Sequence, residues 1–107
     1  MLTYAKLSPS MKALISKPKN EKALKGYSMK ILETTEHSRG ICWTGIIELN
    51  DKPIVKVENT GNGGANDYDY VDKDSYEKLV KLAEQAYPDS YEPLDILVSY
   101  LDVISNL

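Results

Sequence analysis

The chain has 107 residues, about the length of one domain, so we expect a single domain over 1–107 with one hydrophobic core. Hydrophobic residues make up 42% and charged residues 27%, which excludes a disordered or fibrous chain and favours a folded globular one. The net charge is −3, and because residues 31–107 are strongly acidic while residues 1–30 are basic, the charge disfavours nucleic acid as a partner of the whole domain.

The N-terminal region predicts a short helix and then a polar connection. Ser8 and Pro9 supply an N-cap and a first helical residue, and apolar residues then recur at three- and four-residue spacing, which predicts a helix over 9–16. Pro18 ends it. No apolar run here is long enough for a signal peptide or a membrane span, and the single cysteine, Cys42, favours a reducing compartment, so we expect a cytoplasmic protein.

Strands are predicted next along the chain. Alternating apolar and polar residues predict a strand over 27–35, and the β-branched and aromatic residues of 41–49 predict a central strand. A third strand over 53–59 follows a turn, so 41–58 forms a β-hairpin. A short fourth strand is expected near 68–71.

Gly45 interrupts the large residues of the central strand. Glycine has no side chain to pack there, so it marks a place where another backbone or a large side chain approaches closely. We therefore expect a tight contact at Gly45.

Two helices are predicted at the C-terminal end. Asp74 and Glu77 form a capping pair for a helix through Ala86, and Pro93 opens a last helix that runs to residue 107. This last helix has two adjoining apolar stripes, so either it lies between the sheet and the preceding helix, or its surplus face makes a homodimer. One stripe holds Leu94, Leu97, Val98, Leu101 and Ile104, and the other Ile96, Tyr100, Val103 and Leu107.

Together these elements predict an α+β domain. A three- to four-stranded antiparallel sheet would carry the N-terminal helix and the two C-terminal helices packed on it. The alternative is a partly open barrel wrapped around one helix.

A glycine-rich loop over 59–66 is the first candidate binding site. Its glycines permit the backbone conformations in which several N–H groups converge on an anion, so a nucleotide or another anion is the expected ligand. It lacks the lysine of a P-loop and the spacing of a dinucleotide fingerprint, and an ordinary turn between strands is the simpler explanation. The residues concerned are Gly61, Asn62, Gly63 and Gly64.

An acidic tract with tyrosines follows the loop and is the second candidate, a partner-binding surface. Tyrosines are enriched at interface centres, and clustered carboxylates steer the approach of a basic protein. The alternative is that the acids only keep an edge strand from unwanted pairing. The surface consists of Asp67, Tyr68, Asp69, Tyr70, Asp72 and Asp74.

No catalytic or metal-binding motif stands out in the sequence. The one histidine, His37, lies in a predicted turn without a nucleophile motif beside it, and Cys42 lies in apolar company, where thiol reactivity falls. The acidic residues do not follow the spacing of a calcium-binding loop. We therefore expect no enzymatic activity, no cofactor and no metal.

Residues 40–70 resemble a pattern found in small uncharacterised proteins of bacteriophages and mobile elements, a hairpin followed by an N-x-G-x-G-G-x-N loop. The resemblance covers less than a third of the chain and carries no catalytic residue. It implies a context in which small accessory proteins bind and block a host protein, including components of antiviral defence. The pattern consists of Gly40-Ile41, Thr44-Gly45, a turn with Lys52, the run 57–64, and Asn66 before Tyr68.

The function expected from the sequence is therefore non-enzymatic binding of a protein partner through an acidic surface, in the manner of a phage-type inhibitor. The alternative is a protein that sequesters a nucleotide or another anion at the glycine-rich loop.

Overall fold

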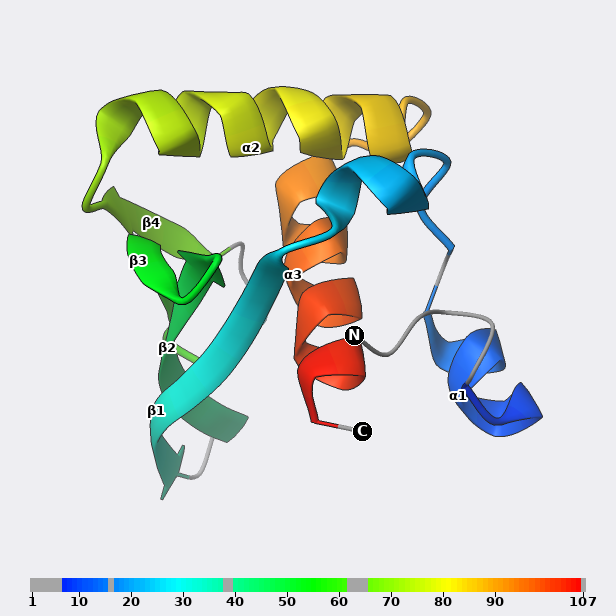
Figure 1. The fold of residues 1–107 in the computed structure, drawn as a ribbon. Helices are drawn as coiled ribbons and strands as arrows, with labels where there is room; N and C mark the ends of the chain where they lie inside the picture. The colour runs from blue at the N-terminus through cyan, green and yellow to red at the C-terminus, as the bar shows by residue number, and fades with distance from the viewer. Residues whose placement is uncertain (1–6, 16, 38–39, 62–65, 107) are drawn as a thin grey trace.

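The computed structural model describes residues 7–15, 17–37, 40–61 and 66–106. Four strands form one antiparallel sheet in the order β1-β2-β3-β4, with two helices against it (Figure 1). The predicted α+β class is therefore confirmed, and the sheet is open at β1 and β4, unlike the barrel alternative. The elements are β1 (Tyr27–His37), β2 (Gly40–Leu49), β3 (Lys52–Asn59), β4 (Asp67–Tyr70), α2 (Lys73–Ala86) and α3 (Pro93–Ser105).

The turn between β2 and β3 follows from its residue types. Asn50 and Asp51 both adopt positive φ, 52° and 68°. A two-residue hairpin turn that matches the twist of its strands requires this conformation, which asparagine and aspartate tolerate better than most residues. The predicted hairpin is confirmed.

The β1–β2 hairpin is longer than the rest of the sheet. β3 pairs with β2 only as far as Trp43, which lies opposite Asn59, whereas β1 pairs with β2 on to Gly40. Residues 35–37 and 40–42 therefore extend beyond β3. We call this part of the hairpin the hairpin arm.

The core lies between one face of the sheet and the two helices. α3 packs against β1 on one side and α2 on the other, which confirms the first of the two predicted environments for its apolar stripes. Of the second stripe, Tyr100 is buried, Ile96 and Val103 are half-buried, and Leu107 lies outside the described residues. Little apolar surface of α3 is thus left for the expected homodimer, which stays a prediction.

The N-terminal segment departs from the prediction. A helix forms, but α1 (Pro9–Leu14) is only six residues long and lies on the far side of α3 from the sheet (Figure 1). The N-terminal element that reaches the core is a 3-10 turn, η2 (Glu21–Leu24), through its buried Leu24. The expected packing of an N-terminal helix on the sheet is wrong, because α3 already occupies that face.

The start of α2 also differs in detail. The N-cap position is held by Asp72 rather than by Asp74, which lies within the first turn. Ser75 Oγ donates to Asp72 Oδ2 at 2.5 Å. The carboxylate of Asp74 still favours the positive end of the helix dipole, so the helix begins near the predicted place.

Candidate functional site

The start of the glycine-rich loop lies against the hairpin arm. A Cβ on Gly40 would stand 2.9 Å from the carbonyl oxygen of Gly61, so the two backbones are in close contact. The Gly61 N–H donates to Asn59 Oδ1 at 2.8 Å. Of the four residues predicted to bind an anion, three lie outside the described part of the chain: Asn62, Gly63 and Gly64.

Tyr68, expected to face a partner, instead points toward α3. Its hydroxyl donates to Asp95 Oδ1 at 2.5 Å and accepts from Asn66 Nδ2 at 3.3 Å, while the Asn66 backbone N–H donates to Asp95 Oδ2 at 3.2 Å. Burial, and after it the hydrogen bond to Asp95, raises the pKa of Tyr68 far above its ordinary value. This network ties β4 to the first turn of α3.

The same contacts weigh against an anion at the loop. The backbone N–H groups of Gly61 and Asn66 already donate to side chains of the protein. The acceptor at Asn66 is the Asp95 carboxylate, which would repel a phosphate brought to the same place. Anion binding stays a prediction about residues 62–64.

The carboxylates of the acidic tract are all on the surface. Tyr70 is 56% exposed and stacks on Tyr76 of α2, with ring centroids 5.9 Å apart. Lys56 of β3 lies opposite Asp69 in the register, which reduces the negative field of this surface. The exposed acids are Asp67, Asp69, Asp72 and Asp74.

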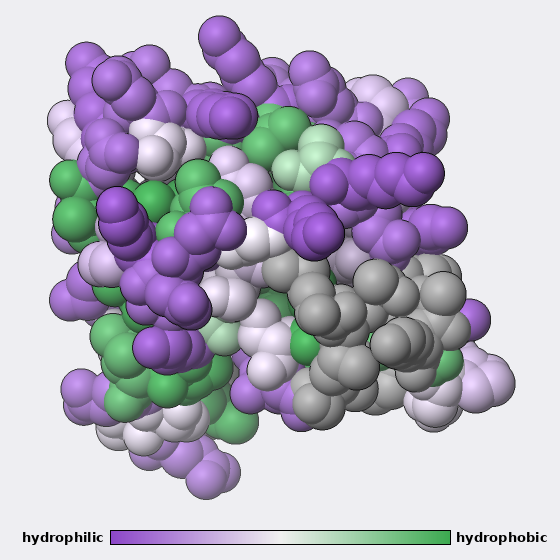
Figure 2. Space-filling view, in the orientation of Figure 1, coloured by the Kyte–Doolittle hydropathy of each residue, from purple (hydrophilic) through white to green (hydrophobic). Residues whose placement is uncertain are grey.

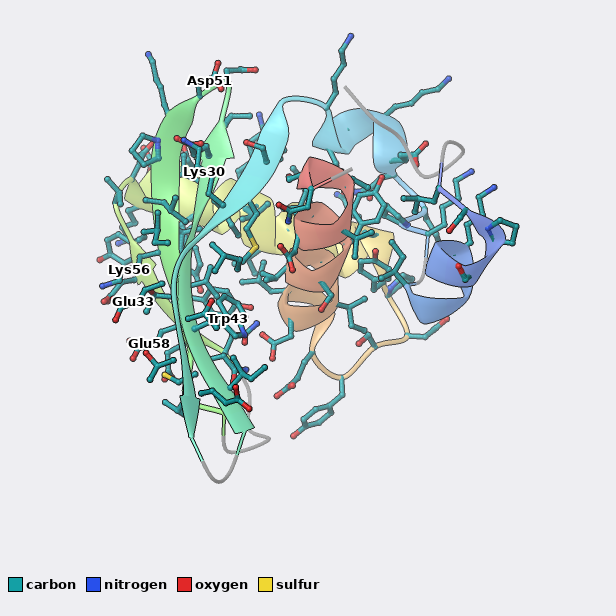
Figure 3. All side chains as sticks on the ribbon, turned by 90° about the horizontal axis from the view of Figure 1, so that it is seen from below. Lys30, Glu33, Trp43, Asp51, Lys56 and Glu58 are labelled. Carbon is teal, nitrogen blue, oxygen red and sulfur yellow. The ribbon has the colours of Figure 1, made fainter. Side chains whose placement is uncertain are left out.

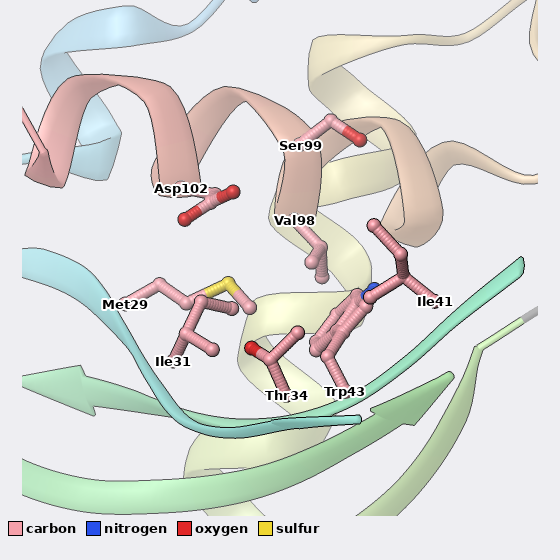
Figure 4. A pocket seen from close by; sticks show the side chains of 8 residues that line it. All are labelled: Met29, Ile31, Thr34, Ile41, Trp43, Val98, Ser99 and Asp102. Carbon is pink, nitrogen blue, oxygen red and sulfur yellow. The ribbon is translucent and has the colours of Figure 1, made fainter. Parts of the chain in front are cut away.

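A groove that the sequence did not indicate lies between the β1–β2 hairpin and α3 (Figure 4). Its volume is about 330 Å³. We call it the arm groove. It is lined by Met29, Ile31 and Thr34 of β1, Ile41 and Trp43 of β2, and Val98, Ser99 and Asp102 of α3.

Side chains alternate between the two faces of the sheet along β1 and β2, and those on the helix side form the apolar wall of the arm groove. Figure 3 shows Trp43 on the helix side of the sheet, whereas Lys30 and Glu58 point away from the helices. Ile31 and Ile41 are 39% and 53% exposed. Apolar side chains on the inner face thus remain accessible to a ligand.

The opposite wall of the arm groove, from α3, adds Ser99 and Asp102 beside the apolar Val98. Among the residues that line the arm groove, Asp102 is the one acidic residue, and none is basic. Asp102 Oδ1 accepts a hydrogen bond from Asn106 Nδ2 at 2.8 Å. This combination suits a ligand with an apolar body and a positive charge.

A second cleft lies next to the arm groove on α3. Ser99 lines both clefts, so they adjoin. The second one holds Tyr91, which is 98% exposed. Its other lining residues are Ser90, Glu92, Asp95 and Ile96.

The described residues offer little for metal or covalent chemistry. Within these ranges no three side chains of histidine, cysteine, aspartate or glutamate lie close enough together to hold a metal ion. Cys42 is half-buried and takes part in no disulfide. No helix in the same ranges is long and apolar enough to cross a membrane.

Comparison of the chain with protein-family models, with curated proteins and with solved structures found no match. The resemblance at 40–70 therefore stays a prediction. The function has to be argued from the geometry of the arm groove.

We expect Tyr68 to make folding stability sensitive to alkaline pH. Because the pKa of Tyr68 is raised in the folded state, its contribution is fully present below about pH 10, the pKa of an unfolded tyrosine, and is lost as the pH rises above that value. The free energy of unfolding of Tyr68→Phe should therefore fall less steeply than that of the unaltered protein above about pH 10. Urea denaturation across this range measures it, and equal slopes would contradict it. The buried Tyr27, whose pKa is also raised, is present in both proteins and cancels.

Proposed function

We propose that the protein is a non-enzymatic binding protein that holds a basic segment of a protein partner in the arm groove. One observation carries this proposal: the partly exposed apolar side chains of Ile31 and Ile41 line the arm groove together with Trp43 and the carboxylate of Asp102. Apolar side chains gathered around an aromatic ring are typical of interaction sites. The carboxylate would select a partner with a positive charge at that point.

The shape of the surface favours a polypeptide over a small molecule. The arm groove and the second cleft share Ser99 as a lining residue, and the second cleft also holds the exposed Tyr91. An extended segment can contact both clefts at once, with one side chain anchored in each. In a typical protein interface, a small number of such anchoring side chains supplies most of the binding energy.

The charges around the arm groove favour a basic partner. α3 contains Asp95 and Asp102 and no basic residue. On the other side, β1 brings Glu36 to the exposed hairpin opposite Ile41, whereas Glu33 points away from the helices (Figure 3). Carboxylates on both sides would speed the approach of a positively charged segment and repel an acidic one.

The resemblance at 40–70 supplies a biological form for this proposal. Small accessory proteins of bacteriophages act by binding and blocking a host protein, so inhibition of a host or defence protein is the form we propose. In that case the basic segment belongs to the protein that is inhibited.

Trp43 provides the test, because it is the only tryptophan in the chain and lines the arm groove. A peptide-display library is selected on the protein, with Ile41→Asp as the counter-selected control. We expect the selected sequences to pair lysine or arginine with apolar residues, and to shift the Trp43 fluorescence on titration. The proposal would be refuted if no peptide bound the unaltered protein better than the Ile41→Asp variant. Selection of acidic sequences would refute it as well.

A further inference from the structure

The outer edge of β1 is open beside the arm groove. β1 is the first strand of the sheet, and within the part of the chain that the structure describes it pairs only with β2. On its outer side the Met29 N–H donates to Ser105 Oγ of α3 at 3.0 Å. Beyond Met29, no backbone hydrogen bond from another described segment reaches this edge, and residues 31–36 are all exposed.

The register shows which backbone groups the open edge presents. In an antiparallel pair, the N–H and C=O groups of successive residues point alternately toward the partner strand and away from it. The Met29 N–H points away from β2, and an irregularity follows between Ile31 and Glu33. Met29 pairs with Ile47 of β2, and beyond the irregularity Thr34 pairs with Trp43 and Glu36 with Ile41. These three partners are separated by even numbers of residues along β2. The backbone N–H groups of Thr34 and Glu36 therefore point away from β2, as that of Met29 does.

This edge leads directly into the arm groove. Ile31 and Thr34 belong to the edge strand and also line the groove, with Asp102 on the opposite wall (Figure 4). Leu32 is 58% exposed, and Figure 2 shows hydrophobic surface gathered over the lower part of the hairpin. Every second side chain of a strand added to this edge would point toward the groove.

We infer that the basic segment of the partner binds as a fifth strand along residues 31–36 of β1, with one of its basic side chains directed at Asp102. This inference rests on the proposed function and specifies how the partner is held. Backbone hydrogen bonds to Thr34 and Glu36 supply pairing that does not depend on side-chain identity, and the arm groove selects the side chain. The added strand continues the four-stranded sheet.

Charge decides between a partner and a second copy of this chain. Residues 31–36 carry Glu33 and Glu36 and no basic residue. Pairing this segment with its own copy would bring like charges together across the strands, which is destabilising. A lysine- or arginine-containing strand instead meets opposite charges, including Asp102.

The first arm of the test alters the peptide and leaves the protein intact. A selected peptide is methylated at one backbone nitrogen at a time, and its affinity is followed through Trp43 fluorescence. Methylation removes an N–H donor, so strand addition predicts an affinity loss of at least about tenfold at alternate positions and little loss between them. This alternation is the signature of strand pairing.

The second arm alters one residue of the protein. Glu36→Pro removes the outward N–H, and proline is tolerated on an edge strand when its nitrogen faces away from the sheet. Glu36→Gln removes the charge and keeps the N–H. We expect the proline variant to lose at least about tenfold in affinity and the glutamine variant less than about threefold, since an exposed ion pair contributes little to binding.

The remaining outcomes distinguish failure of strand addition from failure of the proposed function. If the peptide shifts Trp43 fluorescence but methylation shows no alternation, the groove binds without strand addition: the inference is overturned and the proposed function stands. If no basic peptide affects Trp43, the proposed function fails as well. If light scattering shows a dimer that Glu36→Pro dissociates, the edge pairs with a second copy and the inference is overturned.

Discussion

Asp102→Lys is expected to weaken binding of a selected basic peptide at least about tenfold. Two unit charges about 4 Å apart interact by about 1 kcal/mol in water and about 4 kcal/mol near a protein surface, so reversing the sign changes the binding energy by about 2 kcal/mol or more. About 1.4 kcal/mol corresponds to a factor of ten in affinity. Titration of Trp43 fluorescence measures it, and the effect should shrink as salt is added.

A matched control comes from the other acidic surface. Asp67→Lys with Asp69→Lys reverses two charges on β4, at the opposite edge of the sheet from β1. We expect this double variant to change the affinity by less than about threefold, because charges beyond about 10 Å are largely screened at ordinary salt. If the double variant loses the binding and Asp102→Lys keeps it, the partner site lies on β4, where the sequence placed it.

Gly45→Val is expected to lower the free energy of unfolding by about 1–3 kcal/mol, the range typical of overpacking a core. A Cβ on Gly45 would stand 2.9 Å from the Lys30 carbonyl oxygen and 2.9 Å from the methyl carbon of the buried Met29. Backbone cannot yield as a flexible side chain can, so the strands have to separate. Urea denaturation should show a lower midpoint.

Ile46→Val is the control for this substitution. Ile46 is the next residue of β2, points to the opposite face and is half-buried, so losing one methyl group there should cost about 1 kcal/mol or less. A Gly45→Val variant as stable as the unaltered protein would mean that β1 shifts to accommodate the side chain without loss. In that case the arm groove would also change shape.

The strands and the C-terminal helices could be predicted closely because their signals are local. The turn at Asn50 and Asp51 depends on the backbone preferences of two residues. Pro93 occupies the first position of α3 as predicted. The close approach expected at Gly45 is confirmed by the Lys30 carbonyl and the Met29 side chain.

The candidate site could not be predicted in the same way. The arm groove joins Ile31, Trp43 and Asp102, which are far apart in the sequence and share no spacing. One sign was available: Ile31 and Leu32 are consecutive apolar residues in an alternating strand, and the structure has its β1 irregularity there. That sign indicates a departure from regular pairing but not a groove.

By itself, the sequence determined the α+β class, the antiparallel pairing of β2 with β3 and the positions of α2 and α3, because alternation, turn residues and helix ends act over a few neighbouring residues. Only the tertiary structure decided which surfaces remain free. Tyr68 alternates with acids like an exposed strand residue, yet the approach of Asp95 on α3 turned its hydroxyl inward. α3 occupies the inner face of the sheet with α1 on its far side, and the packing of α3 beside the β1–β2 hairpin forms the arm groove between them.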